Sequence, residues 1–187
     1  MLRTILVPID GHEREMVTAT GVFSGDRLDV GTEVLLDAVP APPKTGELLD
    51  LGCGWGPIAA TLATRSPDAH VWAVDVNARA LSLVERNAEL LSLSNITPAT
   101  PDRVPSEARF ATIWSNPPIR IGKPQLHELL ERWIPRLEPG GTAWLVVQKH
   151  LGADSLLRWL AERFAGFDVE RADSKRTYRI IAVTAPD

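Results

Sequence analysis

The feature of this chain that most limits its fold is an alternation of short apolar segments with longer amphipathic ones. Residues 47–51, 70–74, 110–115 and 142–148 are short and largely apolar, which is typical of buried strands. The longer segments between them carry apolar residues at helical spacing. Such an alternation predicts β-α units around a parallel sheet, so we expect an α/β fold.

Residues that favour helix ends support the expected helices. Pro57 is expected to begin a helix. Proline lacks a backbone N–H, and this lack costs nothing at the first helical position, where an N–H has no partner within the helix. Thr32 is expected to cap a helix over residues 32–39, which the proline-rich residues 40–43 end. Further helices are expected over residues 77–91, 124–137 and 153–164, with Pro135 bending or ending the last turn of the second of these.

We expect a β-hairpin near each end of the chain. Asp10-Gly11 is a turn-forming pair between residues 3–9 and 15–20. Near the C-terminus, residues 173–176 separate two short segments that are expected to pair antiparallel and to close the sheet. These segments are residues 168–172 and 177–183.

The composition limits the class of protein. A length of 187 residues with 44% apolar side chains fits one domain, in which residues 1–43 pack on a core of residues 44–187. One cysteine cannot form an internal disulfide, and the four histidines lack the spacing of metal ligands, so no metal site is expected. Without a signal peptide or an apolar run of about 18–20 residues, the chain is expected to be cytoplasmic and not membrane-bound.

A glycine-rich loop follows the first strand of the core. Its glycines, Gly52, Gly54 and Gly56, can adopt positive φ and let the backbone approach a ligand closely, and the next helix offers free N–H groups. Asp75 ends the following strand, where it can accept hydrogen bonds from both hydroxyls of a ribose. The loop therefore indicates a ribosylated ligand. The alternative is a strand–turn–helix corner in which the glycines serve packing and Asp75 caps a helix.

The detailed form of this loop separates two cofactors. The loop reads G-x-G-x-G with Asp50 two residues before the first glycine, whereas the dinucleotide fingerprint is G-x-G-x-x-G. It resembles motif I of the class I S-adenosylmethionine (SAM) methyltransferases. The resemblance implies that SAM is the cofactor and that it is bound by Asp50, Gly52, Cys53, Gly54, Gly56, Asp75, Val76, Asp102 and Asn116. Cys53 has no neighbouring histidine, so a catalytic thiol is not expected.

A second motif, Asn116-Pro117-Pro118-Ile119, follows the strand over residues 110–115. Two prolines fix the backbone and remove two donors at the carboxyl end of a strand, where ligands bind in open α/β sheets. The side-chain oxygen of Asn116 and the carbonyl of Pro117 can each accept an N–H of an amine, which leaves the nitrogen lone pair free to attack a methyl group. The alternative is a stiff turn that merely ends the strand.

The residues around this turn resemble the "methyltransferase small" family, which includes 16S rRNA guanine-N2 methyltransferases. The turn matches the N/D-P-P-x motif of enzymes that methylate exocyclic or amide nitrogens, although Ile119 replaces the aromatic residue usual in adenine-N6 enzymes. The likeness spans about residues 21–183 and includes residues 21–24, 29–32 and 148–153 and the pair Tyr178-Arg179. It implies a Rossmann-like, seven-stranded, mostly parallel sheet with helices on both faces and an antiparallel C-terminal hairpin.

The resemblance implies methyl transfer to an exocyclic amine of RNA, with guanine N2 of ribosomal RNA as the expected acceptor. The last third of the chain is slightly basic although the whole chain carries a net charge of -4, so RNA phosphates should meet that third. Phe23 or Trp114 would form an apolar wall for the base. The expected RNA contacts are Phe23, Arg120, Lys123, Lys149, Lys175, Arg176 and Arg179.

Two other functions stay open at this point. The same turn would suit the amide of a protein glutamine side chain or the amine of a small molecule. A module that binds SAM or RNA without catalysis is the third candidate.

Overall fold

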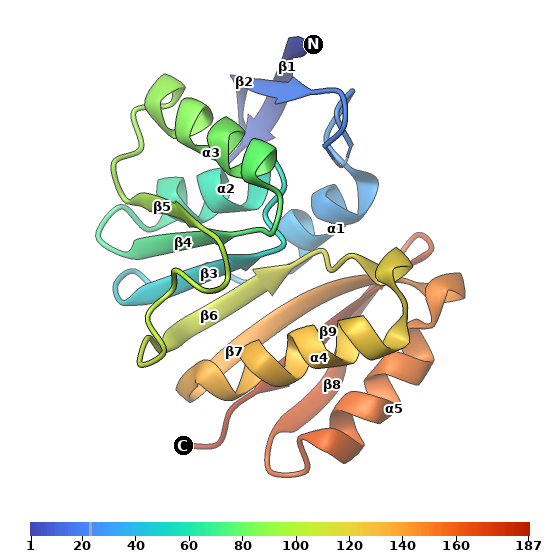
Figure 1. Ribbon diagram of the computed structural model, residues 1–187. Helices are drawn as coiled ribbons and strands as arrows, with labels where there is room; N and C mark the ends of the chain where they lie inside the picture. The colour runs from blue at the N-terminus through green and yellow to red at the C-terminus, as the bar shows by residue number, and fades with distance from the viewer. Residues whose placement is uncertain (23) are drawn as a thin grey trace.

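The computed structural model describes residues 1–22 and 24–187, and its centre is a seven-stranded sheet in the order β5-β4-β3-β6-β7-β9-β8 (Figure 1). Neighbouring strands from β5 to β7 pair parallel, whereas β9 is antiparallel to both β7 and β8. The expected α/β fold with an antiparallel C-terminal hairpin is confirmed. The strands are β3 (Glu47–Leu51), β4 (His70–Val74), β5 (Ile96–Ala99), β6 (Phe110–Ser115), β7 (Leu137–Gln148), β8 (Asp168–Lys175) and β9 (Tyr178–Thr184).

Helices cover both faces of the sheet (Figure 1). The first three pack with a cluster that includes Leu48 and Trp114, and the other two pack with a cluster that includes Leu49 and Phe110. Because successive side chains of a strand point to opposite faces, Leu48 and Leu49 enter different clusters, and both are fully buried. The helices are α1 (Val30–Ala38), α2 (Pro57–Arg65), α3 (Ala78–Leu90), α4 (Lys123–Trp133) and α5 (Ala153–Arg163).

The ends of two helices differ from expectation. The N-cap of α1 is Asp29, whose carboxylate accepts a hydrogen bond of 3.1 Å from the Thr32 amide, so the expected Thr32 cap is wrong. Aspartate caps well because its side chain reaches the free N–H groups of the first turn. Helix α4 ends at Trp133, and Pro135 lies in a 3₁₀ turn over Ile134–Arg136, after which β7 begins five residues earlier than expected.

The N-terminal hairpin consists of β1 (Leu2–Ile9) and β2 (His12–Ala19). Val7 and Met16 pack with Trp55 of the glycine loop and Leu83 of α3. The buried amide of Asn87 accepts a hydrogen bond from the Val17 amide at 2.6 Å and donates to the carbonyls of Val17 and Trp55, both at 2.9 Å. The hairpin is thus attached directly to the glycine loop.

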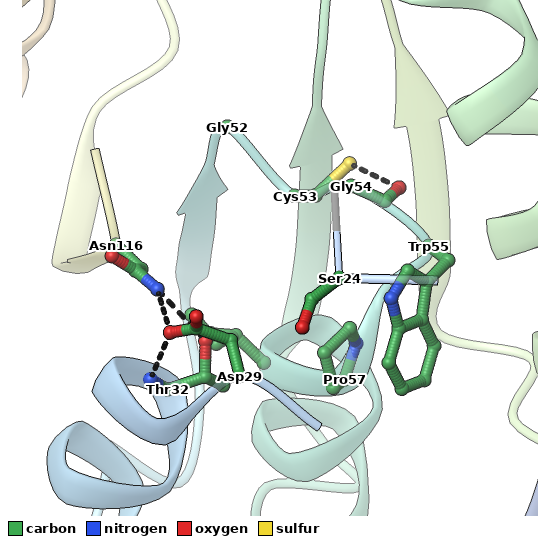
Figure 2. A pocket seen from close by; sticks show the side chains of 10 residues that line it. Ser24, Asp29, Thr32, Gly52, Cys53, Gly54, Trp55, Pro57 and Asn116 are labelled. Atoms are coloured by element: carbon green, nitrogen blue, oxygen red, sulfur yellow. Dashed lines mark hydrogen bonds between the residues drawn. The ribbon is translucent and has the colours of Figure 1, made fainter. Parts of the chain in front are cut away.

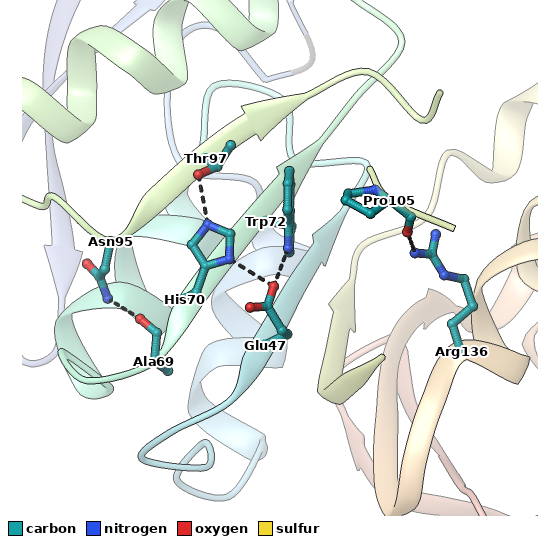
Figure 3. A network of polar contacts seen from close by, with 8 residues as sticks. All are labelled: Glu47, Ala69, His70, Trp72, Asn95, Thr97, Pro105 and Arg136. Atoms are coloured by element: carbon teal, nitrogen blue, oxygen red, sulfur yellow. Dashed lines mark hydrogen bonds and ion pairs between the residues drawn. The ribbon is translucent and has the colours of Figure 1, made fainter. Parts of the chain in front are cut away.

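The crossover from β5 to β6 is irregular chain over residues 100–109. Two arginines hold this crossover. Arg132, in the last turn of α4, donates to the Pro101 carbonyl at 2.7 Å. Arg136, in the 3₁₀ turn after α4, donates to the Ala108 carbonyl and to the Pro105 carbonyl, the second of which is drawn in Figure 3. These bonds let the crossover pack on the sheet without a helix of its own.

A polar network links three neighbouring strands near this crossover (Figure 3). The Glu47 carboxylate accepts from the Trp72 indole and contacts His70 Nδ1 at 2.8 Å, and His70 Nε2 contacts Thr97 Oγ1 at 2.8 Å. The network satisfies the polar groups of half-buried side chains on β3, β4 and β5. Within the described residues, every helix is too short or too polar to cross a membrane.

Candidate functional site

A pocket at the carboxyl ends of β3 and β6 brings together the two motifs found in the sequence (Figure 2). The glycine loop forms one side of it, Asn116 lies on another side, and the first turn of α1 closes the space between them. A Cβ atom built on Gly52 would lie 3.8 Å from Pro118 Cδ, so the two motifs are near van der Waals contact. The lining residues are Ser24, Asp29, Thr32, Gly52, Cys53, Gly54, Trp55, Pro57, Ile58 and Asn116.

The glycines of the loop serve different physical needs. Gly52, Gly54 and Gly56 have φ values of 76°, 54° and 93°, in the left-handed region that side chains with a Cβ rarely adopt. A Cβ on Gly54 would meet nothing within 4 Å, whereas one on Gly56 would lie 3.1 Å from a methyl carbon of Val84. Gly54 therefore leaves open space above the loop, and Gly56 permits close packing against α3.

Asp75 is held over this loop by two backbone amides. One carboxylate oxygen accepts from the Gly54 amide at 2.9 Å, and the other accepts from the Asn77 amide at 2.9 Å. The N-cap of α3 is Asn77, whose side chain accepts from the Arg79 amide, so capping of α3 does not explain Asp75. The half-buried carboxylate keeps lone pairs that can accept from ligand hydroxyls.

Asp50 is fully buried at the end of β3, beneath the loop. One of its carboxylate oxygens accepts from the Ala59 amide at 2.9 Å, and the other has no hydrogen-bond partner among the described residues. Burial raises the pKa of Asp50 well above its usual range, and the nearby Asp75 adds to the effect. A buried acceptor without a donor is costly, and the ammonium of a bound amino-acid moiety is a donor that suits it.

The Cys53 thiol is buried beneath the glycine loop. Burial raises its pKa well above the ordinary value, and the carboxylates of Asp50 and Asp75 raise it further. A thiol in this environment stays protonated at neutral pH. Cys53 therefore contributes its small volume and its backbone to the pocket.

The Asn116 amide is oriented by the first turn of α1 (Figure 2). Its nitrogen donates to a carboxylate oxygen of Asp29 at 2.7 Å and to the Thr32 hydroxyl at 3.1 Å. Because a carboxylate can only accept, the amide nitrogen must face Asp29, which leaves the side-chain oxygen free to accept from a ligand. Asp29 and Thr32 were not among the expected site residues, although the segment 29–32 was part of the family resemblance.

The rest of the Asn-Pro-Pro turn departs from expectation in one respect. The Pro117 carbonyl, expected to be free for a substrate, accepts from the Ile119 amide at 2.8 Å. It therefore offers one remaining lone pair. Ile119 is half-buried in a 3₁₀ turn over Ile119–Ile121, and Pro118 is exposed.

Two expected cofactor contacts lie at the margin or outside of this pocket. Val76 is 83% exposed next to Asp75. Asp102 lines a separate hollow with Arg132 and Arg136, where a hydrogen bond from Thr100 lowers its pKa. The structure therefore does not bring Asp102 together with the glycine loop in one pocket.

The expected basic residues gather along the carboxyl edge of the sheet. Because β9 runs antiparallel, its first residues and the turn before it lie at the same edge as the ends of β6 and β7. Lys175 contacts Asp37 at 2.9 Å, and Lys123 contacts the Ser155 hydroxyl at 3.4 Å. Arg120, Lys149 and Arg176 are exposed at this edge, and Arg179 is half-buried.

Phe23 and Trp114 were expected as alternative apolar contacts for the substrate base. Trp114 is 1% exposed within the core of β6, so its assignment to a substrate wall is wrong. Its side chain points into the face that α1 and α2 cover, because strand residues alternate between faces. Phe23 lies outside the described residues.

Comparison with known proteins identifies the family. Residues 13–182 match the model of the methyltransferase small domain. The chain belongs to this family. The expected enzyme class and cofactor are thereby confirmed: this methyltransferase small domain is a SAM-dependent methyltransferase.

The relatives of this methyltransferase domain include one of nearly equal length and several longer ones. It is 38% identical over 165 residues to uncharacterized protein YbxB of Bacillus subtilis, covering 87% of this chain and 81% of that protein. It is 34% identical over 143 residues to ribosomal RNA small subunit methyltransferase C of Shewanella loihica, covering 74% of this chain and 41% of that protein. The chain thus spans less than half the length of that rRNA methyltransferase.

A solved structure has the same fold. The T. thermophilus 16S rRNA N2 methyltransferase RsmC, in complex with AdoMet and guanosine, superposes with a TM-score of 0.84 at 24% identity. The match covers 98% of this chain and 50% of that chain. Because it includes nearly every residue, the N-terminal hairpin and the C-terminal hairpin are both parts of the shared fold.

Proposed function

We propose that this methyltransferase transfers a methyl group to an exocyclic amine of RNA, with guanine N2 of ribosomal RNA as the acceptor. The observation that carries the proposal is the oriented side-chain oxygen of Asn116, which accepts from none of the described residues and lies at the edge of the sheet beside the glycine loop. The relatives named ribosomal RNA small subunit methyltransferase C support RNA as the substrate class.

In this proposal, residues of the glycine loop and the ends of β3 and β4 bind the cofactor. Asp75 accepts hydrogen bonds from the ribose hydroxyls, and the unpaired oxygen of Asp50 accepts from the ammonium of the methionine moiety. The open space above Gly54 admits the ligand close to the backbone. When bound, SAM supplies an electrophilic methyl group on a sulfonium.

The Asn-Pro-Pro turn then positions the acceptor amine. The Asn116 oxygen and the remaining lone pair of the Pro117 carbonyl accept the two N–H groups, and the nitrogen lone pair points toward the methyl group. No strong base is needed, because the two acceptors stabilise the positive charge that develops on nitrogen while the carbon–sulfur bond breaks to leave a neutral thioether, and the methylated nitrogen then loses its extra proton to water. Holding the reactants in contact can lower the barrier by as much as about 7–11 kcal/mol.

The basic residues of the carboxyl edge bind the RNA backbone in this proposal. The target base must leave its stack to reach Asn116, and the exposed cations around the turn would hold the neighbouring phosphates. Ile119 contributes apolar contact to the base in place of an aromatic ring. The cations are Arg120, Lys123, Lys149, Lys175, Arg176 and Arg179.

The test is incubation of the protein with methyl-labelled SAM and small ribosomal subunits, followed by digestion and identification of the labelled nucleoside. The proposal expects N2-methylguanosine as the labelled product, and a strongly reduced rate of labelling with Asn116→Ala. Label in ribosomal protein, or in any nucleoside other than N2-methylguanosine, would contradict it. SAM binding without transfer to the small subunit would instead favour another acceptor, such as a protein glutamine or the amine of a small molecule.

A further inference from the structure

The same carboxylate oxygen of Asp29 binds two groups that are far apart in the chain. It accepts from the Thr32 amide at 3.1 Å, as the cap of α1, and from the Asn116 side-chain nitrogen at 2.7 Å, across 87 residues of sequence. The Thr32 hydroxyl, buried in the first turn of α1, is a second acceptor for Asn116 at 3.1 Å. Both acceptors of the amide nitrogen thus belong to the start of α1, one to its N-cap and one to its first turn.

The packing around this contact is tight. A Cβ atom on Gly31 would lie 2.9 Å from the Asp29 carboxylate, 2.9 Å from the Tyr178 ring and 3.3 Å from the Asn116 nitrogen. A side chain at this position would therefore displace Asp29 and Tyr178, and glycine lets α1 pass closely between the turn and β9. The first turn of α1 therefore has little room to move relative to Asn116.

We propose that Asp29, assisted by Thr32, is a positioning residue that keeps the Asn116 oxygen turned toward the substrate and so makes the site selective for an N–H nucleophile. The inference rests on the proposed function, because it explains how the amine acceptor is oriented. A flipped amide would bring its oxygen against the Asp29 carboxylate, which cannot donate. It would also present N–H groups to the substrate amine in place of an acceptor.

Two substitutions of Asp29 separate positioning from helix capping. Asp29→Asn keeps an oxygen of the same reach, so it can still accept from both Thr32 and Asn116. Asp29→Ser keeps a good N-cap but is too short to span to Asn116. A role in capping alone predicts equal behaviour of the two variants, whereas the positioning role predicts that only the serine variant fails.

The kinetic experiment compares both variants with the unsubstituted protein in methyl transfer to small ribosomal subunits. For Asp29→Ser we expect kcat to fall about tenfold to a hundredfold, the effect of losing a hydrogen bond to a charged group, with SAM affinity and melting temperature unchanged. For Asp29→Asn we expect kcat to stay much closer to that of the unsubstituted protein. Unchanged kcat in the serine variant, or an equal loss in both variants, would overturn the proposal.

A second readout does not depend on the substrate. In the ligand-free protein, the two side-chain amide protons of Asn116 should exchange slowly with water by NMR, and this protection should persist in Asp29→Asn and disappear in Asp29→Ser. Rapid exchange in the unsubstituted protein would refute the orientation of the amide. Protection together with failure to methylate any RNA would refute the proposed function and leave the orienting contact standing.

Discussion

The side-chain nitrogen of Asn116 lies 2.7 Å from a carboxylate oxygen of Asp29, so the turn that ends β6 and the cap that begins α1 form one unit. Asp29 comes from the segment that joins the N-terminal hairpin to α1, whereas Asn116 follows the fourth strand of the sheet in sequence order. The contact connects the N-terminal part of the chain to the turn that we assign to catalysis.

A double-mutant cycle should show that these two residues act through one another. Asn116→Ala should lower turnover strongly with nearly unchanged SAM affinity, because it removes the proposed acceptor and leaves the glycine loop intact. In that background Asp29→Ser should add little, since the contact it disrupts is already absent. Single-turnover methyl transfer measures both effects, and additive losses would show that Asp29 acts elsewhere.

Thr32→Val tests the second acceptor of the Asn116 amide. The substitution conserves volume and removes the hydroxyl, which is 3.1 Å from the amide nitrogen. We expect a smaller loss of kcat than for Asp29→Ser, about fivefold, because a hydrogen bond between neutral groups contributes about 1 kcal/mol. A loss as large as that of the serine variant would mean that Thr32 is the dominant partner.

Asp75→Ala should weaken SAM binding by about tenfold to a hundredfold, through loss of a charged acceptor worth about 1.5–3 kcal/mol. Part of the loss of SAM affinity should come from a less ordered glycine loop, because the Asp75 carboxylate accepts a hydrogen bond from the Gly54 amide. Asp68→Ala, at an exposed loop carboxylate, is the matched control. Isothermal titration calorimetry measures the affinities, and equal binding by both variants would remove Asp75 from the cofactor site.

The buried Asp50 should make both stability and ligand binding depend on pH. Because burial raises its pKa in the folded state above the unfolded value, the protonated group favours the fold, and this contribution is lost as pH rises through the folded pKa. Asp50→Asn keeps an acceptor for the Ala59 amide and cannot ionise. At neutral pH it should leave the ligand-free protein as stable or more stable in urea.

Asp50→Asn should also bind SAM more weakly, because it lacks the carboxylate charge that we propose to pair with the ammonium of SAM. Chemical denaturation across pH 5–8 and calorimetry of SAM binding give the two measurements. A less stable variant with full SAM affinity would contradict both parts of the prediction.

Charge neutralisation at the carboxyl edge should flatten the salt dependence of RNA binding. Arg176→Gln should reduce the slope of log Kd against log salt by about one unit, as expected for one lost phosphate contact. Lys175→Gln should reduce it less, because Lys175 is already paired with Asp37 at 2.9 Å. Arg86→Gln, on the exposed side of α3, controls for net charge. An identical slope in Arg176→Gln and the control would exclude Arg176 as a phosphate contact.

Much of the fold follows from local patterns in the sequence. The strands β3, β4 and β6 have the bounds that their apolar runs predict, because a strand buried on both faces needs consecutive apolar residues. Helix α2 begins at Pro57, because the fixed φ of proline suits the first position of a helix. The position of both motifs at strand ends follows in the same way. Parallel strands end at one edge, so both motifs were expected at that edge, and the direct pairing of β3 with β6 brings them into one pocket.

The orientation of the site depends on contacts between residues distant in the chain. Local patterns do not reveal that Asp29 caps α1 and also binds Asn116, that Trp114 faces the core, or that Asp102 lies in a separate hollow. A residue type shows what a side chain can donate or accept. Which partner it meets depends on how α1, the sheet and the irregular crossover pack, since a hydrogen bond forms only between groups that folding brings within about 3 Å of each other.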